Sequence, residues 1–160
     1  MVSGGGSEMA ELNDAVYQEF DAMIERGCRT RKLRLRWTSA LQSCQVGDYW
    51  VVPLTTSSDL RKEGAAMRHC VGSQDVLCAM GGYVIFSIRD LDNRRLATMS
   101  LFFDQHGWHL EQLKGMENAE VTYREESFYN GERTETIREP TELYFVAQEI
   151  LRQYRATAIS

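Results

Sequence analysis

Three short, strand-like segments in the second half of the chain constrain its fold most strongly. Tyr83–Arg89, Leu96–Phe103 and Trp108–Leu113 are rich in β-branched and aromatic residues. The connections Asp90-Leu91-Asp92-Asn93 and Gln105-His106-Gly107 are short and made of turn-forming residues. Consecutive strands with such short loops pair antiparallel. The sequence therefore predicts an antiparallel meander.

Other segments extend this meander into an α+β domain. Tyr49–Leu54 reads as a further strand that joins the sheet, which gives about four to five strands in all. A helix is expected from Asp59 to about Met67, with Ser57 or Ser58 as its N-cap. A second short helix is expected over Gln74–Met80. We expect the helices to cover one face of the sheet.

The two ends of the chain add an N-terminal and a C-terminal helix. Residues 1–7 form a Gly/Ser-rich flexible leader, and a helix is predicted from Glu8 to about Glu25. Residues 123–139 are polar and predict either a mobile excursion or an added β-hairpin. Pro140 introduces a final helix with apolar residues at helical spacing. We expect residues 8–160 to form a single domain.

Composition limits the class of protein. The net charge of −5 argues against wholesale wrapping by nucleic acid, although it leaves room for a local basic patch. Apolar runs are far shorter than the ~20 residues that span a bilayer, and no signal peptide is visible. We expect a cytoplasmic protein that does not bind membranes and keeps its four cysteines as thiols.

The segment from Arg26 to Trp37 carries most of the basic charge. From Lys32 onward its residues alternate basic and apolar side chains, which predicts a strand with one basic face. Arg31, Arg34 and Arg36 are the candidate binding residues of this segment. One interpretation is a ribbon that contacts phosphates or an acidic partner. The other is a solvated face that balances the acidic first helix.

The middle of the chain contains a series of ordered submotifs. They are Leu60, Glu63-Gly64, Met67, His69-Cys70-Val71-Gly72-Ser73, Cys78, Ile85-Phe86-Ser87-Ile88-Arg89, Ala97-Thr98 and Gln112-Leu113-Lys114-Gly115-Met116-Glu117-Asn118. Together they resemble the PcfJ-like family over about residues 49–121. Many relatives have an aromatic residue where this chain has Gln74. The resemblance implies a context of conjugative plasmids, integrative elements and phages, but it implies no particular reaction.

The His69-Cys70 pair suggests a nucleophile and a base. Adjacent side chains diverge, however, so a working dyad would pair Cys70 with His109, or His69 with Cys78, across the fold. The alternative is that both cysteines are small buried hydrophobic residues and that His69 caps a carbonyl. Glu63 either orients an imidazole or acts as a general base, or it is an ordinary solvated helix residue.

The segment that ends the third strand has ligand-binding chemistry. Gln112, Lys114 and Asn118 surround Gly115 and can hydrogen-bond a base, an amide or a phosphate. Gly115 itself is expected to permit a tight turn. Arg89 is either an anion anchor or one half of a surface ion pair with Asp90 or Asp92.

No pattern of ligands predicts a metal site or a cofactor. His106 and His109 are closely spaced, but the chain has no Cys-x-x-Cys pair, and His106 falls in a turn whereas His109 falls in a strand.

Two functional hypotheses follow. The first is an accessory or interaction domain of mobile-element biology that binds a nucleic acid or a protein through the Arg-rich segment and the Gln112–Asn118 loop. The second is a small Cys/His-dependent hydrolase or transferase with Cys70 as its nucleophile.

Overall fold

A five-stranded antiparallel sheet forms the body of the protein. The computed structural model describes Gln18 and residues 34–158. The strands follow the order β1-β2-β3-β4-β5 and pair antiparallel throughout: β1 (Cys44–Val46), β2 (Tyr49–Leu54), β3 (Tyr83–Asp90), β4 (Arg95–Asp104) and β5 (Gly107–Lys114). The predicted α+β class and meander are confirmed. The short β1 was not predicted.

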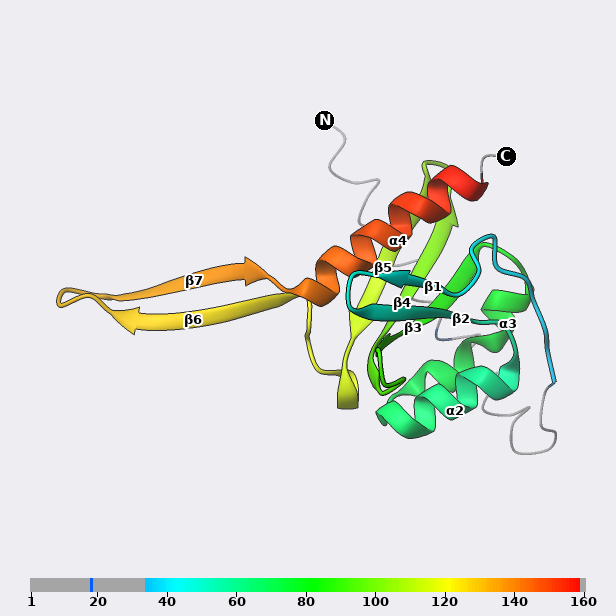
Figure 1. The fold of residues 1–160 in the computed structure, drawn as a ribbon, viewed down its shortest axis with the longest axis horizontal. Helices are drawn as coiled ribbons and strands as arrows, with labels where there is room; N and C mark the ends of the chain where they lie inside the picture. The colour runs from blue at the N-terminus through cyan, green and yellow to red at the C-terminus, as the bar shows by residue number, and fades with distance from the viewer. Residues whose placement is uncertain (1–17, 19–33, 159–160) are drawn as a thin grey trace.

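Helices cover both faces of this sheet, so the expectation that they cover one face was wrong. On one face, Val84, Phe86 and Ile88 of β3 pack in a core with α4 (Glu142–Ala158). On the other face, Tyr83 and Ile85 pack with α2 (Ser57–Met67) and α3 (Asp75–Ala79). Figure 1 shows α4 on one side of the strands and α2 on the other.

The face beneath α2 changes from apolar to polar along the strands. Ser87, Thr98 and Ser100 point to this face and are buried, whereas Met99 and Leu101 between them point to the α4 core. The candidate site described below lies on this polar part of the face.

Local contacts define the ends of α2. Its N-cap is Thr56, not Ser57 or Ser58, because the Thr56 hydroxyl accepts a hydrogen bond from the Asp59 amide at 3.0 Å. At the other end Arg68 takes a left-handed conformation (φ 55°), and the chain reverses into the 3-10 helix η1 (Cys70–Gln74). The predicted second helix is therefore η1 followed by α3.

Gly64 allows η1 to lie against α2. A Cβ atom at this position would lie 2.9 Å from the carbonyl oxygen of His69, closer than a side chain tolerates. The contact brings His69 back over the sheet.

The predicted hairpin forms a separate two-stranded sheet, β6 (Tyr123–Tyr129) and β7 (Thr134–Pro140). It projects away from the body of the molecule (Figure 1). Among the described residues no helix is long and apolar enough to cross a membrane.

The N-terminal predictions are described only in part. The leader, the first helix apart from Gln18, and Arg31 lie outside the described residues. Where the structure describes the Arg-rich segment, Arg34 and Arg36 are exposed and alternate with half-buried Leu35 and Trp37. This part forms an isolated bridge between Arg36 and Thr56 rather than the predicted strand.

Candidate functional site

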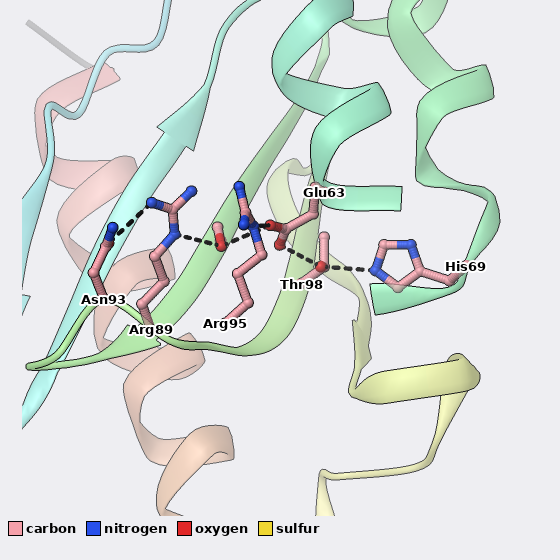
Figure 2. Close-up of polar contacts among 7 residues, drawn as sticks. Glu63, His69, Arg89, Asn93, Arg95 and Thr98 are labelled. Carbon is pink, nitrogen blue, oxygen red and sulfur yellow. Dashed lines mark hydrogen bonds and ion pairs between the residues drawn. The ribbon is translucent and has the colours of Figure 1, made fainter. Parts of the chain in front are cut away.

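A buried carboxylate organises the polar half of the α2 face. Glu63 is fully buried and accepts three hydrogen bonds. Its Oε1 accepts from Ser87 Oγ (2.9 Å) and from Arg95 Nε (2.7 Å), and its Oε2 accepts from Thr98 Oγ1 (2.6 Å). Figure 2 shows Glu63 at the centre of this row. A buried charge requires such partners, so this is a specific structure rather than a solvated glutamate.

Thr98 connects this carboxylate to His69. The Thr98 hydroxyl has one hydrogen, which it donates to Glu63, so it can only accept from His69 Nε2 at 2.8 Å. The hydrogen on His69 is thereby fixed at Nε2, and Nδ1 carries a lone pair. His69 does not cap a carbonyl through its ring, as one interpretation of the sequence held.

His69 Nδ1 is buried and has no hydrogen-bond partner. Burial lowers the pKa of His69, and the nearby Glu63 carboxylate only opposes this shift. The neutral ring therefore presents a hydrogen-bond acceptor with its lone pair unused.

This ring forms part of the wall of a cavity of about 380 Å³, called here the His69 cavity. Five residues singled out in the sequence line it: His69, Cys70, Gln112, Lys114 and Asn118. The two ends of the motif region therefore meet at one place. Gln74, Thr98 and Ser100 also line the cavity, and the buried Ser100 Oγ has no hydrogen-bond partner either.

The loop after β5 shapes the rim. Gly115 has an ordinary backbone conformation (φ −89°), and its role is close packing, because a Cβ there would lie 2.8 Å from Val121 Cγ1. The left-handed residues of this loop are Glu117 and Asn118 instead. Lys114 is half-buried, and its Nζ lies 3.6 Å from Glu120 Oε2.

Arg89 supports the buried row and does not line the His69 cavity. It donates from Nε to Ser87 Oγ (3.0 Å) and from a terminal nitrogen to Asn93 Oδ1 (3.0 Å). Asp90 pairs with Arg94 rather than with Arg89, contrary to the ion pair that one interpretation expected.

The two proposed dyads are not brought together. His109 bonds Asp104 at 2.9 Å and faces Phe102 near the far end of β4. Cys78 is buried in the core beneath α3, and burial raises its pKa. Among the described residues no group of three His, Cys, Asp or Glu side chains can hold a metal ion.

Cys70 differs from Cys78 because its side chain is exposed. It lines the His69 cavity, so it is not the buried hydrophobic residue that one interpretation proposed. No hydrogen bond joins its thiol to His69 in the part of the chain that the structure describes, in line with the divergence of adjacent side chains.

A second cavity lies at the start of α2. It measures about 410 Å³ and is lined by Arg34, Arg36 and Arg61 together with Thr56 and Ser58. We call it the arginine cavity. Two of the three arginines that line it, Arg34 and Arg36, come from the segment that the sequence singled out.

Sequence reasoning assigned no role in the site to Thr98, Ser100, Ser87 or Arg95. Thr98 and Ser100 carried a visible signal, because they alternate with Ala97, Met99 and Leu101 and so mark a polar strip on one strand face. Ser87 interrupts the apolar run of β3 in the same way. Arg95 carried no signal, because its role depends on pairing with a residue in α2.

Comparison with known proteins gives one match. The family model described as PcfJ-like protein matches residues 7–129, which extends beyond the submotifs at both ends. No curated protein and no solved structure matches the chain.

Proposed function

Because the chain belongs to the PcfJ-like family, we propose that it is an accessory or interaction domain of mobile-element biology. In this proposal the His69 cavity binds a polar group of a nucleic acid or of a protein. The cavity is of the size that takes a small molecule or one protruding group of a larger partner.

One observation carries this proposal: two buried polar atoms, His69 Nδ1 and Ser100 Oγ, are unpartnered, and both residues line one cavity. Leaving a buried polar atom without a partner costs about 1–3 kcal/mol. A ligand that bonds both atoms recovers this free energy on binding. The hydrogen bond from His69 Nε2 to Thr98 also favours binding, because it holds the Nδ1 acceptor in a fixed direction before the ligand arrives.

Amide NMR tests the proposal. The protein is titrated with short oligonucleotides and with peptides, and the amide signals of Ser100, Gln112 and Asn118 are followed. We expect a binding partner to shift these signals, and Gln112→Ala with Asn118→Ala to weaken its binding about tenfold. Gln105→Ala, an exposed carboxamide on the β4–β5 turn, is the control. A partner that binds the double variant with unchanged affinity would show that it binds elsewhere.

A second function is favoured by the exposed Cys70 thiol on the same cavity. In this candidate the protein is a Cys/His-dependent hydrolase or transferase in which the Cys70 thiolate attacks the substrate. Labelling with iodoacetamide, quantified at Cys70 by mass spectrometry, tests it as a function of pH. A Cys70 thiol whose measured pKa lies well below the ordinary value of about 8.5 supports catalysis, provided that His69→Ala restores the ordinary value. An ordinary thiol profile removes its main support.

A further inference from the structure

The floor of the His69 cavity carries hydrogen-bonding groups from two adjacent strands. Thr98 pairs with Lys114 and Ser100 pairs with Gln112 across β4 and β5, so these four residues are neighbours on one face. His69 is held above Thr98 through Nε2. Its Nδ1 can only accept, the Lys114 ammonium can only donate, and the unpartnered Ser100 hydroxyl has a hydrogen to give.

A ligand that complements these three groups offers a donor to His69 Nδ1 and acceptors to Ser100 and Lys114. The imide edge of uracil or thymine offers both, with an N–H between two carbonyl oxygens. Cytosine and adenine have a ring nitrogen lone pair in the place of that N–H, which would face the lone pair of His69 Nδ1. A side-chain carboxamide supplies only one acceptor beside its donor, and it would leave much of a cavity of about 380 Å³ unfilled.

The charge around the cavity favours nucleic acid over a peptide as the source of this group. Basic residues outnumber acidic ones on residues 34–36, on the outer surface of α2 and at its C-cap. Arg34, Arg36, Arg61, Lys62 and Arg68 are exposed there, against the half-buried Asp59. In the loop after β5, Glu117 pairs with Arg68 and Glu120 pairs with the half-buried Lys114. This face is basic within a chain of net charge −5. A basic face in an acidic protein is the electrostatic pattern expected for phosphate contacts.

The two cavities are connected through α2. Arg61 lines the arginine cavity, and its Cα lies 3.5 Å from where a Cβ on Gly72 would be. Gly72 belongs to η1, whose residues Cys70 and Gln74 line the His69 cavity. The 11 residues of α2 span roughly 16 Å, which a strand of a few nucleotides can cover.

We infer that the His69 cavity binds one unpaired uracil or thymine base of a single-stranded nucleic acid, whose phosphates contact the arginine cavity. This inference rests on the proposed binding function and names its ligand. His69 and Ser100 read the base, and Arg34, Arg36 and Arg61 bind the backbone without reading sequence.

Fluorescence anisotropy with dye-labelled oligonucleotides of uridine, cytidine or adenosine tests this inference. We expect the uridine oligonucleotide to bind about tenfold more tightly than the other two. Thr98→Val removes the acceptor that locks His69 and should abolish the preference for uridine. Arg34→Ala with Arg36→Ala should weaken all three complexes alike and reduce their dependence on salt. Arg133→Ala, on the exposed hairpin, is the control and should change neither.

Several results would overturn the inference. They are equal affinity for the three oligonucleotides, a uridine preference that survives in Thr98→Val, or affinities that the two arginine substitutions leave unchanged. If Thr98→Val does not fold, Ser100→Ala replaces it and should also reduce the preference for uridine.

A further titration separates this inference from the proposed function. If acetamide or a peptide shifts the Ser100 and Gln112 amide signals and uridine does not, only the base assignment fails; if nothing shifts them, both fail.

Discussion

The Glu63 carboxylate is the residue on which the geometry of the site depends most. Glu63→Gln replaces one accepting oxygen by an amide that cannot accept, and it removes the charge opposite Arg95. We expect the free energy of unfolding to fall by about 2–3 kcal/mol, less than for a fully buried ion pair, because the Arg95 side chain is 30% exposed. Urea denaturation measures the change.

Glu117→Gln is the matched control for this substitution. It breaks an ion pair of similar length, between Arg68 and Glu117 at 3.0 Å, but both side chains are largely exposed. We expect it to cost less than about 0.5 kcal/mol. Equal losses in the two variants would mean that the buried row contributes no more than a surface pair.

His69 should make stability depend on pH. Its pKa is lowered in the folded protein from the ordinary 6.5, so the unfolded chain binds a proton more readily than the folded one. This contribution to stability is complete above about pH 6.5 and is lost as the pH falls through the lowered folded-state pKa. Urea unfolding at a series of pH values should show a decline below about pH 6.5 that is reduced in His69→Gln and kept in His106→Gln. A decline of the same size in His69→Gln would assign it to other groups.

The residues that line the His69 cavity were more predictable than those that hold them in place. His69, Cys70, Gln112, Lys114 and Asn118 belong to short motifs, and a motif is visible in the sequence. The partners of Glu63 come from two strands that are far from α2 in sequence, so the contacts depend on sheet register and helix docking. Glu63 itself gave a usable signal, because it shares a helix face with Leu60 and Met67.

At the scale of elements, the packing of η1 against α2 places His69, and Gly64 controls that packing. At an ordinary helix position, Gly→Ala stabilises by about 0.5–1 kcal/mol. At Gly64 the added Cβ meets the His69 carbonyl at 2.9 Å, so we expect Gly64→Ala to destabilise by about 1–3 kcal/mol instead. Urea denaturation gives the sign of the effect, and the His69 ring signals in NMR should shift with it.

Ala66→Gly is the reference for this substitution, since Ala66 is exposed on the same helix. It should cost about 0.5–1 kcal/mol through helix propensity alone and leave the His69 signals unchanged. Stabilisation by Gly64→Ala would mean that η1 does not press on α2.

The positions of β2, β3, β4 and β5 were predicted to within a residue, whereas β1 and the coverage of both faces of the sheet were not predicted. Alternation and turn residues mark where β3, β4 and β5 begin and end, and both signals are local. Coverage on two faces was also visible in β3, because Tyr83-Val84-Ile85-Phe86 contains no polar residue and all four side chains are buried. A half-solvated strand would alternate with polar residues there.

For the molecule as a whole, the two faces of the sheet differ in role. The α4 face stabilises the fold, and the α2 face carries the proposed binding site. The α4 face is a continuous apolar core. On the α2 face, a row of buried polar groups and a cavity take the place of part of the apolar packing. A rigid core behind the sheet allows unpartnered polar atoms to be tolerated in front of it, as is common at functional sites.

This division predicts that the β6–β7 hairpin can be removed without unfolding the body, whereas α4 cannot. The hairpin side chains are mostly exposed, and its ends are adjacent, because the Thr141 amide bonds the Thr122 carbonyl at 3.0 Å. Replacing residues 124–139 by a short Gly-Ser linker should change the free energy of unfolding by less than about 1 kcal/mol. Truncation before Glu142 removes five buried core side chains and should leave no cooperative transition: Val146, Ala147, Ile150, Leu151 and Tyr154. Urea denaturation of both variants decides between these outcomes, and a large loss on hairpin removal would show that the arm supports the core.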